Sequence, residues 1–312
     1  MKEEVRISCI FNPEAGRGRF RIGPSELEKM LKDKAREKNK ELRLEMSVTE
    51  RTGDAERIAR KLSKKDTDTI VACGGDGTIY EAANGMVDSG KALGIIPIGS
   101  GNDTMTSING GPRPMDDCIS DIIRGIRHSV DVGMMNDRYF MNVVGVGMDA
   151  AINHEVAKRR GMVLRFGPTF QYFFCTFRVI PTWRDMEMLL TIDGTGEVKR
   201  EIKMLTVGNG TTCGGGFRLT PLARMDDGLL DVGIINKAGT LRTLTSVPKA
   251  FKGKHLDLDL TDYRKMRSLK VRTEDDRELP YHIDGEKGFA RSFEFQVFQG
   301  KMWTVHPLKG VN

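Results

Sequence analysis

The sequence predicts two domains, an α/β domain at the N-terminus and an all-β sandwich at the C-terminus. Before about residue 130, short apolar segments alternate with segments of helical periodicity. This alternation is typical of a doubly wound, largely parallel sheet covered by helices on both faces. After Val130, short apolar runs recur between turn residues, which indicates antiparallel strands. No low-complexity linker joins the two parts, so we expect closely packed domains with a cleft between them.

The composition is that of a globular protein. Of the 312 residues, 39% are hydrophobic and 29% are charged, which excludes a disordered chain. No run approaches the ~18 apolar residues of a membrane helix, and the N-terminus lacks the features of a secretory signal. Five cysteines with long spacings and no CxxC pair argue against disulfides and zinc. The net charge of +6 suits an anionic partner.

The elements of the N-terminal domain follow in order from hydrophobic patterning. Buried parallel strands are short and apolar, whereas surface helices carry apolar residues at a spacing of three and four. The expected strands are residues 5–11, 42–48, 69–73 and 93–98, and the expected helices are residues 25–41, 54–62 and 78–87.

The elements of the C-terminal domain are predicted from runs of β-branched, aromatic and other apolar residues. Several of these runs alternate between apolar and polar side chains, as half-buried strands do. The expected strands are residues 139–144, 186–192, 201–207, 229–235, 269–272 and 293–298, with a further short strand at 281–283.

The strongest chemical signal is the glycine-rich loop GGDGT at residues 74–78. It follows a predicted strand and opens a helix that we expect to begin near Ile79. Glycines let the backbone turn sharply and approach a ligand, and a helix N-terminus offers unpaired N–H groups suited to phosphate. The alternative is a plain strand–helix turn in which Asp76 or Thr78 caps the helix. Three glycines within four residues exceed what a cap requires.

Two further loops strengthen the phosphate interpretation. GSGND at 99–103 and NPEAGRG at 12–18 also follow predicted strands, and Thr49 ends another. In a doubly wound sheet such loops converge at the carboxyl edge, so we expect a triphosphate site there. There is no GxxxxGK[ST] P-loop. GVGMDA at 145–150 fits a dinucleotide fingerprint, but residues 160–182 contain no acidic partner, so turn glycines are the better interpretation.

Six motifs in this order resemble the diacylglycerol kinase catalytic family, and within it the soluble bacterial lipid kinases. They are NPEAG (12–16), TERTGDA (49–55), GGDGT (74–78), GSGND (99–103), TPLARMDDGLLD (220–231) and YHIDGE (281–286). GGDGT alone is less specific, because NAD kinases and 6-phosphofructokinases carry related loops. The resemblance implies the fold shared by NAD kinases and diacylglycerol kinases, with the active site in the interdomain cleft.

The resemblance also implies how the domains divide the work. Residues 1–130 would bind ATP, residues 131–301 would carry the lipid substrate, and residues 302–312 would return to the first domain. The nucleotide contacts would be Asn12, Pro13, Glu14, Ala15, Gly16, Thr49, Gly74, Gly75, Asp76, Gly77, Thr78, Ile79, Tyr80 and Ser100.

The acidic turn at 226–231 suits a hard divalent cation, although a hairpin turn is the alternative. By resemblance, a structural Mg²⁺ is held by the backbone oxygens of Arg224 and Leu229 and by the carboxylate of Asp227. The catalytic Mg²⁺ would be held by the nucleotide phosphates, with Asp76 as a contact. In the second acidic element, Glu286 would accept the proton of the attacking hydroxyl and Asp284 would support it.

Residues 151–184 combine basic and aromatic side chains, as a membrane-surface segment does. The alternative is a core helix with snorkelling arginines; single-stranded nucleic acid also binds such sets, but no nucleic-acid motif is present. The basic residues are Lys158, Arg159, Arg160, Arg165, Arg178 and Arg184, and the aromatic ones are Phe166, Phe170, Tyr172, Phe173, Phe174, Phe177 and Trp183.

Together these observations predict an ATP-dependent lipid kinase that converts diacylglycerol to phosphatidic acid in phospholipid biosynthesis. An NAD kinase and a non-catalytic nucleotide- or lipid-binding module are the alternatives. We expect a cytoplasmic protein at the inner face of the membrane, without a nucleic-acid partner. Phosphatidylglycerol, sphingosine-like bases and undecaprenol stay open as acceptors, and so does a homodimer.

Overall fold

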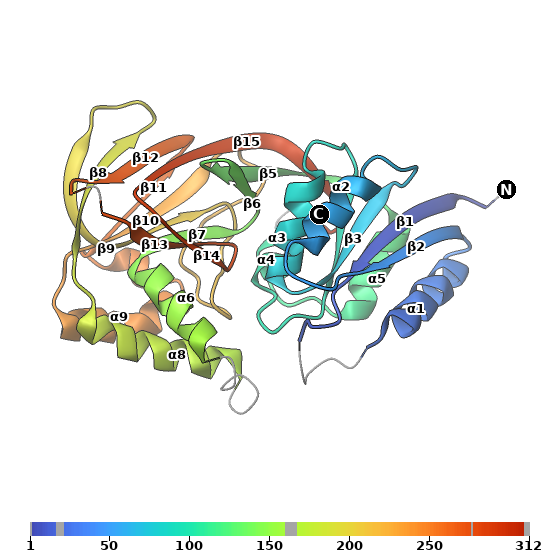
Figure 1. Cartoon of the computed structure of the whole chain (residues 1–312), viewed down its shortest axis with the longest axis horizontal. Coiled ribbons are helices and arrows are strands. Elements are labelled where there is room, and N and C mark those ends of the chain that lie inside the picture. The colour runs from blue at the N-terminus through green and yellow to red at the C-terminus, as the bar shows by residue number, and fades with distance from the viewer. Residues whose placement is uncertain (1, 17–21, 160–166, 276, 309–312) are drawn as a thin grey trace. The chain divides into compact units, whose positions relative to one another are not determined.

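The computed structural model describes residues 2–16, 22–159, 167–275 and 277–308. The chain divides into two compact units (Figure 1). Unit 1 comprises residues 1–131 and 300–312, and unit 2 comprises residues 132–299. The chain passes from one unit to the other within two strands, β5 (His128–Met135) and β15 (Ser292–Thr304).

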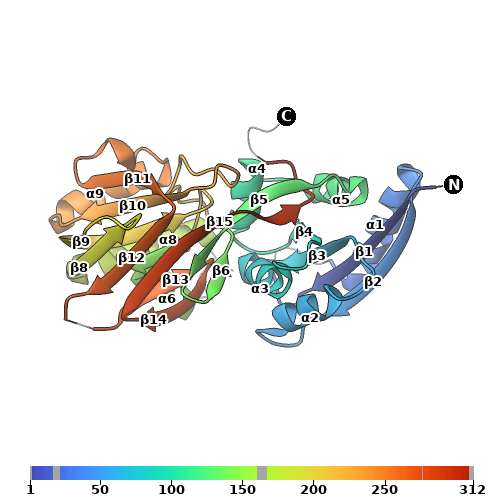
Figure 2. The same ribbon diagram turned by 90° about the horizontal axis from the view of Figure 1, so that it is seen from above.

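Unit 1 contains a parallel sheet in the order β4-β3-β1-β2, which confirms the predicted sheet (Figure 2). Its strands are β1 (Glu4–Phe11), β2 (Glu41–Val48), β3 (Thr69–Gly74) and β4 (Ala92–Pro97). The last residues of β15 extend the sheet, because Trp303 and Thr304 pair in parallel with Ala92 and Leu93 of β4. Every residue of β3 and β4 is buried, as expected for central strands covered on both faces.

In the described part of unit 1, three helices connect the strands of this sheet, and two more follow β4. They are α1 (Pro24–Glu37), α2 (Asp54–Leu62), α3 (Asp76–Met86), α4 (Asp103–Asn109) and α5 (Met115–Arg124). Side chains of α1 and α5 share one hydrophobic core with the sheet. Helices α2 and α3 pack together (Figure 1). Two predicted boundaries were wrong: α1 ends at Glu37, before a left-handed turn at Asn39, and α3 begins at Asp76 rather than near Ile79.

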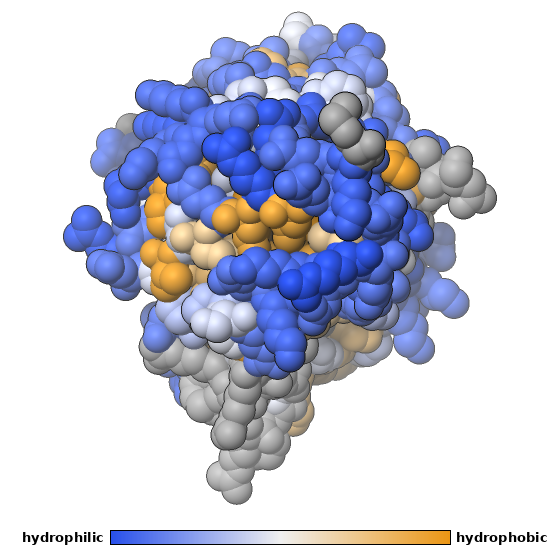
Figure 3. Space-filling view, turned by 90° about the vertical axis from the view of Figure 1, so that its right-hand side faces the viewer, coloured by the Kyte–Doolittle hydropathy of each residue, from blue (hydrophilic) through white to orange (hydrophobic). Residues whose placement is uncertain are grey.

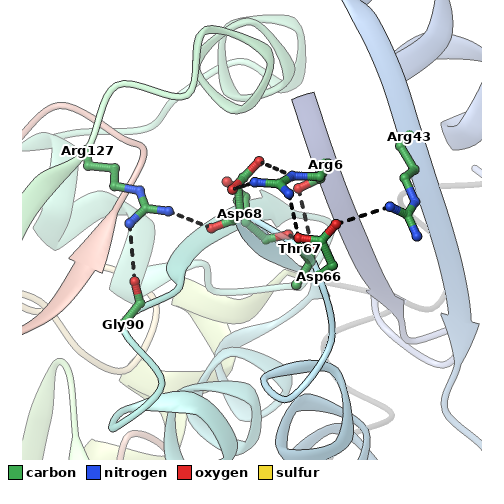
Figure 4. A network of polar contacts seen from close by, with 8 residues as sticks. Arg6, Arg43, Asp66, Thr67, Asp68, Gly90 and Arg127 are labelled. Carbon is green, nitrogen blue, oxygen red and sulfur yellow. Dashed lines mark hydrogen bonds and ion pairs between the residues drawn. The ribbon is translucent and has the colours of Figure 1, made fainter. Parts of the chain in front are cut away.

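An ion-pair network joins the starts of β1, β3 and β4, away from the glycine-rich loops (Figure 4). Arg6 donates hydrogen bonds to Asp68 at 2.8 and 3.0 Å and also contacts Asp66. These bonds from Arg6 lower the pKa of Asp68, although partial burial acts in the opposite direction. Arg127 donates to the carbonyls of Gly90 and Asp68, both at 3.2 Å. The network therefore stabilises the amino edge of the sheet.

Unit 2 is built on antiparallel strands. One set runs β14-β13-β7-β9-β10-β11, and a second runs from the first half of β9 through β8 and β12 to β15. The bounds are β6 (Arg138–Phe140), β7 (Val143–Gly147), β8 (Met186–Ile192), β9 (Val198–Gly208), β10 (Leu230–Asn236), β11 (Thr261–Met266), β12 (Ser268–Thr273), β13 (Leu279–Ile283) and β14 (Glu286–Ala290).

Helices complete unit 2, which is therefore not purely β. They are α6 (Met148–Lys158), α8 (Pro168–Val179) and α9 (Thr240–Phe251), with 3₁₀ turns at Ile180–Thr182 and His255–Asp257. Their apolar side chains pack in one core with residues of β7, β9 and β10. None of the helices in the described part of the chain is long and apolar enough to cross a bilayer.

The predicted strand at residues 139–144 was wrong as a single element. The chain leaves strand geometry at Met141 and Asn142, between β6 and β7. The N–H groups of Met141, Asn142 and Val143 all donate to the carboxylate of Asp284. This carboxylate replaces strand pairing for those amides, so the strand breaks there.

Candidate functional site

The GGDGT loop lies where the sequence places it, between β3 and α3 at the carboxyl edge of the unit 1 sheet. Gly75 precedes the first turn of α3, and no side chain caps that turn. A β-carbon on Gly74 would lie 2.4 Å from the hydroxyl oxygen of Thr78. Glycine at position 74 therefore leaves room for the side chain of Thr78, so α3 can begin two residues after β3 ends. The first-turn N–H groups of α3 are therefore open to an anion.

The GSGND loop packs against GGDGT, backbone to backbone. A β-carbon on Gly99 would lie 2.4 Å from the Cα of Gly75, so only glycine fits at this contact. Asp76 accepts a hydrogen bond from the N–H of Thr104, in the first turn of α4, at 2.9 Å. Ser100 is exposed beside this contact. The two loops and the two helix starts therefore lie together at one place in unit 1.

The first loop also lies at this place. Asn12 follows β1, and its side-chain amide donates to the hydroxyl of Thr78 at 2.9 Å. Its carboxamide oxygen accepts from the N–H of Glu14, which shapes the turn through Pro13 to Gly16. Thr49 is buried, and its N–H donates to the carbonyl of Phe11. The structure therefore brings together Asn12, Thr49, the GGDGT loop and Ser100.

Two of the expected nucleotide contacts point elsewhere. The side chains of Ile79 and Tyr80 are buried, at 0% and 6% exposure, because they form the core face of α3. The N–H of Ile79 is used by the helix, donating to the carbonyl of Gly75. Residues 17 and 18 of the first loop lie outside the described residues.

The Asp-Gly-Glu turn in unit 2 joins β13 to β14. Asp284 adopts a left-handed backbone conformation, with φ of 48°, and Gly285 follows with φ of 92°. The buried carboxylate of Asp284 accepts hydrogen bonds from the N–H groups of Met141, Asn142 and Val143, at 2.8 to 3.0 Å. These bonds fix the turn, so the carboxylate of Asp284 is engaged in holding the backbone.

Glu286 has a different environment. It opens β14, is partly exposed, and pairs across the turn with Ile283. No side chain in the described ranges forms a hydrogen bond or ion pair with its carboxylate. A carboxylate without a protein partner can accept a proton from a substrate hydroxyl.

The acidic turn before β10 offers oxygen donors. Asp227 accepts from the N–H of Leu229 at 3.1 Å and forms an ion pair with Lys265. Lys265 also lies 3.7 Å from the carboxylate of Asp231, whose pKa is raised by burial. A carboxylate with neighbouring carbonyl oxygens fits the donor preference of Mg²⁺. A divalent ion at Asp227 would have to displace the ammonium group of Lys265, and the side chain of Arg224 is already paired with Asp226.

A buried polar group that the sequence did not predict lies beside an apolar cavity of unit 2. Asp149, in the first turn of α6, accepts from the hydroxyl of Tyr172 at 3.2 Å and contacts Nε2 of His282 at 2.9 Å. The cavity, of about 70 Å³, is lined by Asp149 and Tyr172 together with apolar side chains of α6, α8, α9, β9 and β10. A β-carbon on Gly145 would lie within 2.4 Å of both Asp149 and His282. The glycines of GVGMDA, at 145–150, were therefore the sequence signal that could have pointed to this buried pair of Asp149 and His282.

The basic and aromatic segment divides between core and surface. Tyr172 is buried and Phe173 packs on the same core. Phe170, Phe174 and Phe177 are 49%, 41% and 46% exposed, at a spacing that places them on one face of α8. Arg159 and Arg178 both pair with Glu155, which leaves the local charge positive. Arg160, Arg165 and Phe166 lie outside the described residues.

Comparisons with known proteins match most of the chain. Residues 6–135 match the family model of the diacylglycerol kinase catalytic domain, and residues 142–302 match that of the YegS C-terminal NAD kinase beta sandwich-like domain. The diacylglycerol kinase of Staphylococcus saprophyticus is 30% identical over 292 residues, covering 92% of this chain and 90% of that protein. That of Bacillus subtilis is 27% identical over 307 residues, covering 97% and 96%.

Solved structures share the fold. A diacylglycerol kinase structure from Bacillus anthracis matches with a TM-score of 0.70 at 22% identity, covering 96% of each chain. An NAD kinase from Archaeoglobus fulgidus in complex with ATP matches with a TM-score of 0.52 at 13% identity, covering 96% of this chain and 93% of that one. The β-sandwich expected for the second domain is confirmed by the family model and by this shared fold.

Proposed function

Because this chain belongs to the diacylglycerol kinase family, and is thus a kinase, we propose that it transfers the γ-phosphate of ATP to a lipid hydroxyl. Diacylglycerol is the proposed acceptor, with phosphatidic acid and ADP as products. The observation that carries this proposal is that unit 1 has a glycine-lined phosphate surface, while unit 2 has a carboxylate, Glu286, with no side-chain partner among the described residues.

The nucleotide is proposed to bind on unit 1. Phosphate oxygens would accept hydrogen bonds from the first-turn N–H groups of α3 and from Ser100, with Asn12 to Gly16 and Thr49 beside them. The part of this surface closest to the phosphates would be the GGDGT loop, that is Gly74, Gly75, Asp76, Gly77 and Thr78. Ile79 and Tyr80 would contribute only by packing, since their side chains are buried. Such a surface stabilises the transferring phosphoryl group by position and charge.

The acceptor lipid is proposed to bind on unit 2. Glu286 would take the proton of the attacking hydroxyl, and Asp284 would hold the turn that presents it. The apolar cavity beside Asp149 and Tyr172 would receive part of the lipid. The carboxylate of Asp149, which lines the cavity, would then lie near the polar end of the lipid. Long acyl chains need more room than about 70 Å³. We therefore expect α6, α8 and α9 to separate when lipid binds.

Magnesium is proposed at two places. The carbonyls of Arg224 and Leu229 with the carboxylate of Asp227 would hold one ion, and the ATP phosphates with Asp76 the other. When bound, these ions supply positive charge that offsets the charge of the phosphates. We further propose that the exposed aromatic face of α8 contacts the membrane and that the protein acts at its inner, cytoplasmic surface; the exposure of Phe170, Phe174 and Phe177 supports the contact.

Labelled ATP with a lipid panel in mixed micelles tests the proposal. The panel holds diacylglycerol, phosphatidylglycerol, a sphingosine-like base and undecaprenol, with NAD as a soluble competitor. We expect label in phosphatidic acid, and none after Asp76→Ala, whose fold is checked by circular dichroism. Label in NADP would replace the proposal with an NAD kinase. Nucleotide binding without any labelled product would leave a non-catalytic module.

A further inference from the structure

Three metal-ligating side chains of different chemistry meet inside unit 2. They are the carboxylate of Asp149, the thiol of Cys213 and the imidazole of His282, and one ligand atom of each lies within 4.8 Å of the others. All three residues are buried, with exposures of 2%, 6% and 1%. None of them belongs to the proposed ATP and magnesium sites, so the cluster needs an explanation of its own.

Main-chain hydrogen bonds hold each member of the cluster in place. Asp149 lies in the first turn of α6, and His282 lies on β13, where it pairs with Gly145 of β7. Cys213 follows β9, and its N–H and C=O exchange hydrogen bonds with Phe217 at 2.8 and 2.9 Å. The three ligands come from distant parts of the chain. The sequence therefore shows no CxxC spacing, although the fold brings a thiol to an imidazole and a carboxylate.

The glycine at position 145 leaves the room in which the cluster forms. A β-carbon there would lie within 2.4 Å of both Oδ2 of Asp149 and Nε2 of His282. These two atoms are 2.9 Å apart. In a tetrahedral zinc site with bonds of about 2.0–2.3 Å, neighbouring ligand atoms are roughly 3.3–3.8 Å apart. Side-chain shifts of roughly 1 Å would therefore bring the three ligand atoms to that geometry.

The charge of the cluster favours a divalent cation. The carboxylate of Asp149 accepts from the hydroxyl of Tyr172 and contacts His282, and no lysine or arginine in the described ranges pairs with it. It lines a cavity whose walls are mostly apolar, where an unpaired carboxylate is costly. A divalent ion bound by this carboxylate, by a thiolate from Cys213 and by a neutral imidazole would make a site without net charge.

The imidazole ring and the carboxylate can both turn toward an ion. Nδ1 of His282 is buried and has no hydrogen-bond partner among the described residues, so no second hydrogen bond fixes the ring. Rotation about the Cβ–Cγ bond can therefore offer either nitrogen. The hydroxyl of Tyr172 donates to Oδ1 of Asp149 at 3.2 Å, as the outer partners of metal ligands do. The ion would replace the present contact between Oδ2 and Nε2.

We propose that Asp149, Cys213 and His282 bind Zn²⁺ or a transition-metal ion of the same preference. Thiolate and imidazole ligands favour such ions over Mg²⁺, which prefers oxygen. As the ion binds, the thiol of Cys213 gives its proton to solvent. Three protein ligands leave the fourth position to water. The ion fastens α6 and the loop after β9 to β13, the strand that leads into the turn at Asp284 and Glu286.

Zinc binding by the untagged full chain, without ATP or lipid, tests the proposal independently of kinase activity. Figure 3 shows a largely hydrophilic side of the molecule, and such surfaces hold ions weakly, so dialysis with Zn²⁺ contains excess Mg²⁺. We expect about one zinc ion per chain by elemental analysis. Cys213→Ser and His282→Gln should each weaken binding by about tenfold or more. Cys175→Ser, in the same core, and His255→Gln, in the same cavity, are the matched controls and should bind zinc normally.

Cobalt(II) gives a readout that a folding defect does not imitate. Co²⁺ bound to a thiolate shows a sulfur-to-metal charge-transfer band, which we expect in the wild type and in Cys175→Ser but not in Cys213→Ser. His282→Cys exchanges one ligand for another, so it should keep the ion and strengthen the band. Zn²⁺ should also raise the unfolding temperature of the wild type and not that of Cys213→Ser. A wild type without bound zinc, a cobalt spectrum without the thiolate band, or full zinc binding by Cys213→Ser would overturn the proposal.

Discussion

At the scale of single residues, the contact between Gly75 and Gly99 sets the shape of the proposed phosphate surface. A β-carbon on Gly99 would meet the Cα of Gly75 at 2.4 Å, and backbone cannot move aside as a flexible side chain can. Both loops would have to shift if this position changed. The close approach of the two loops therefore explains the glycines at 75 and 99, whether or not a ligand also requires them.

Gly99→Ala should therefore weaken nucleotide binding by about tenfold or more and destabilise the fold by about 1–3 kcal/mol. Calorimetric titration with a non-hydrolysable ATP analogue and urea denaturation measure the two effects. Gly111→Ala is the matched control, because no heavy atom lies within 4 Å of its added β-carbon. Wild-type affinity in Gly99→Ala would show that the loops do not depend on this contact.

Asp284 and Glu286 are two residues apart but differ in what holds them. The carboxylate of Asp284 is buried under three N–H donors, whereas Glu286 has no side-chain partner among the described residues. Asp284→Asn turns one acceptor into a donor facing these amides. It should lower the free energy of unfolding by about 2 kcal/mol or more. Glu278→Gln, whose side chain is 58% exposed, should change stability little. Equal urea midpoints for both variants would refute this role of Asp284.

At the scale of elements, the exposed face of α8 carries the proposed membrane contact. Phe170, Phe174 and Phe177 place three rings on one face, and cations on α6 and α8 lie in the same segment. Aromatic rings at the acyl boundary and basic groups at anionic headgroups act together in such surfaces.

The variant Phe174→Ser/Phe177→Ser should lose most of its binding to anionic vesicles, about tenfold or more, because it removes two exposed rings that would enter the membrane interface. Vesicle sedimentation with phosphatidylglycerol measures this. Leu241→Ser, on an apolar side chain of α9 that is 76% exposed, is the matched control. If both variants sediment as the wild type does, α8 is not the contact.

A buried histidine, His306, adds to the strand pairing that holds the end of β15 in unit 1. Nε2 of His306 accepts from the N–H of Ile95 at 2.8 Å, and Nδ1 donates to Asp121 at 3.2 Å. Burial lowers the pKa of His306, although Asp121 acts in the opposite direction. Protonation would place a donor against the Ile95 N–H. The neutral ring is therefore the form that stabilises this attachment.

A lowered pKa fixes the direction of the pH effect. Below the unfolded value of about 6.5 the unfolded chain binds a proton that the folded chain does not, so stability falls as the pH falls. Urea denaturation at pH 7.5 and 5.5 should show this loss. His306→Gln should be less stable at pH 7.5 but lose less on acidification. His154 and His255, whose pKa burial also lowers, keep part of the effect. If His306→Gln loses as much stability between pH 7.5 and 5.5 as the wild type does, His306 is not a source of the pH effect.

At the scale of the whole molecule, the sequence predicts those parts of the fold that depend on residues close together in the chain. Fully apolar segments indicated β3 and β4, and glycine clusters marked the loops that follow them. Both signals depend on residues close in sequence. Helix α4 was missed because it has only seven residues between Asn102 and Gly110, both left-handed, too few for a helical period.

The site was predicted less completely for a different reason. Asp149 and His282 are 133 residues apart in sequence and meet only in the folded unit. The strand at 139–144 broke because Asp284, similarly distant, takes its amides. Family motifs carried Asp284 into the prediction but described it as a support for catalysis. The hydrogen bonds around it assign it first to the architecture of the turn.

The central claim is that Glu286 accepts the proton of a lipid hydroxyl while unit 1 holds ATP. A single-turnover measurement with diacylglycerol in mixed micelles tests it most directly, because it isolates phosphoryl transfer from binding. Glu286→Gln should slow the transfer by about 10²–10⁴-fold and leave ATP affinity and thermal stability unchanged. Transfer at the wild-type rate in Glu286→Gln would contradict the account.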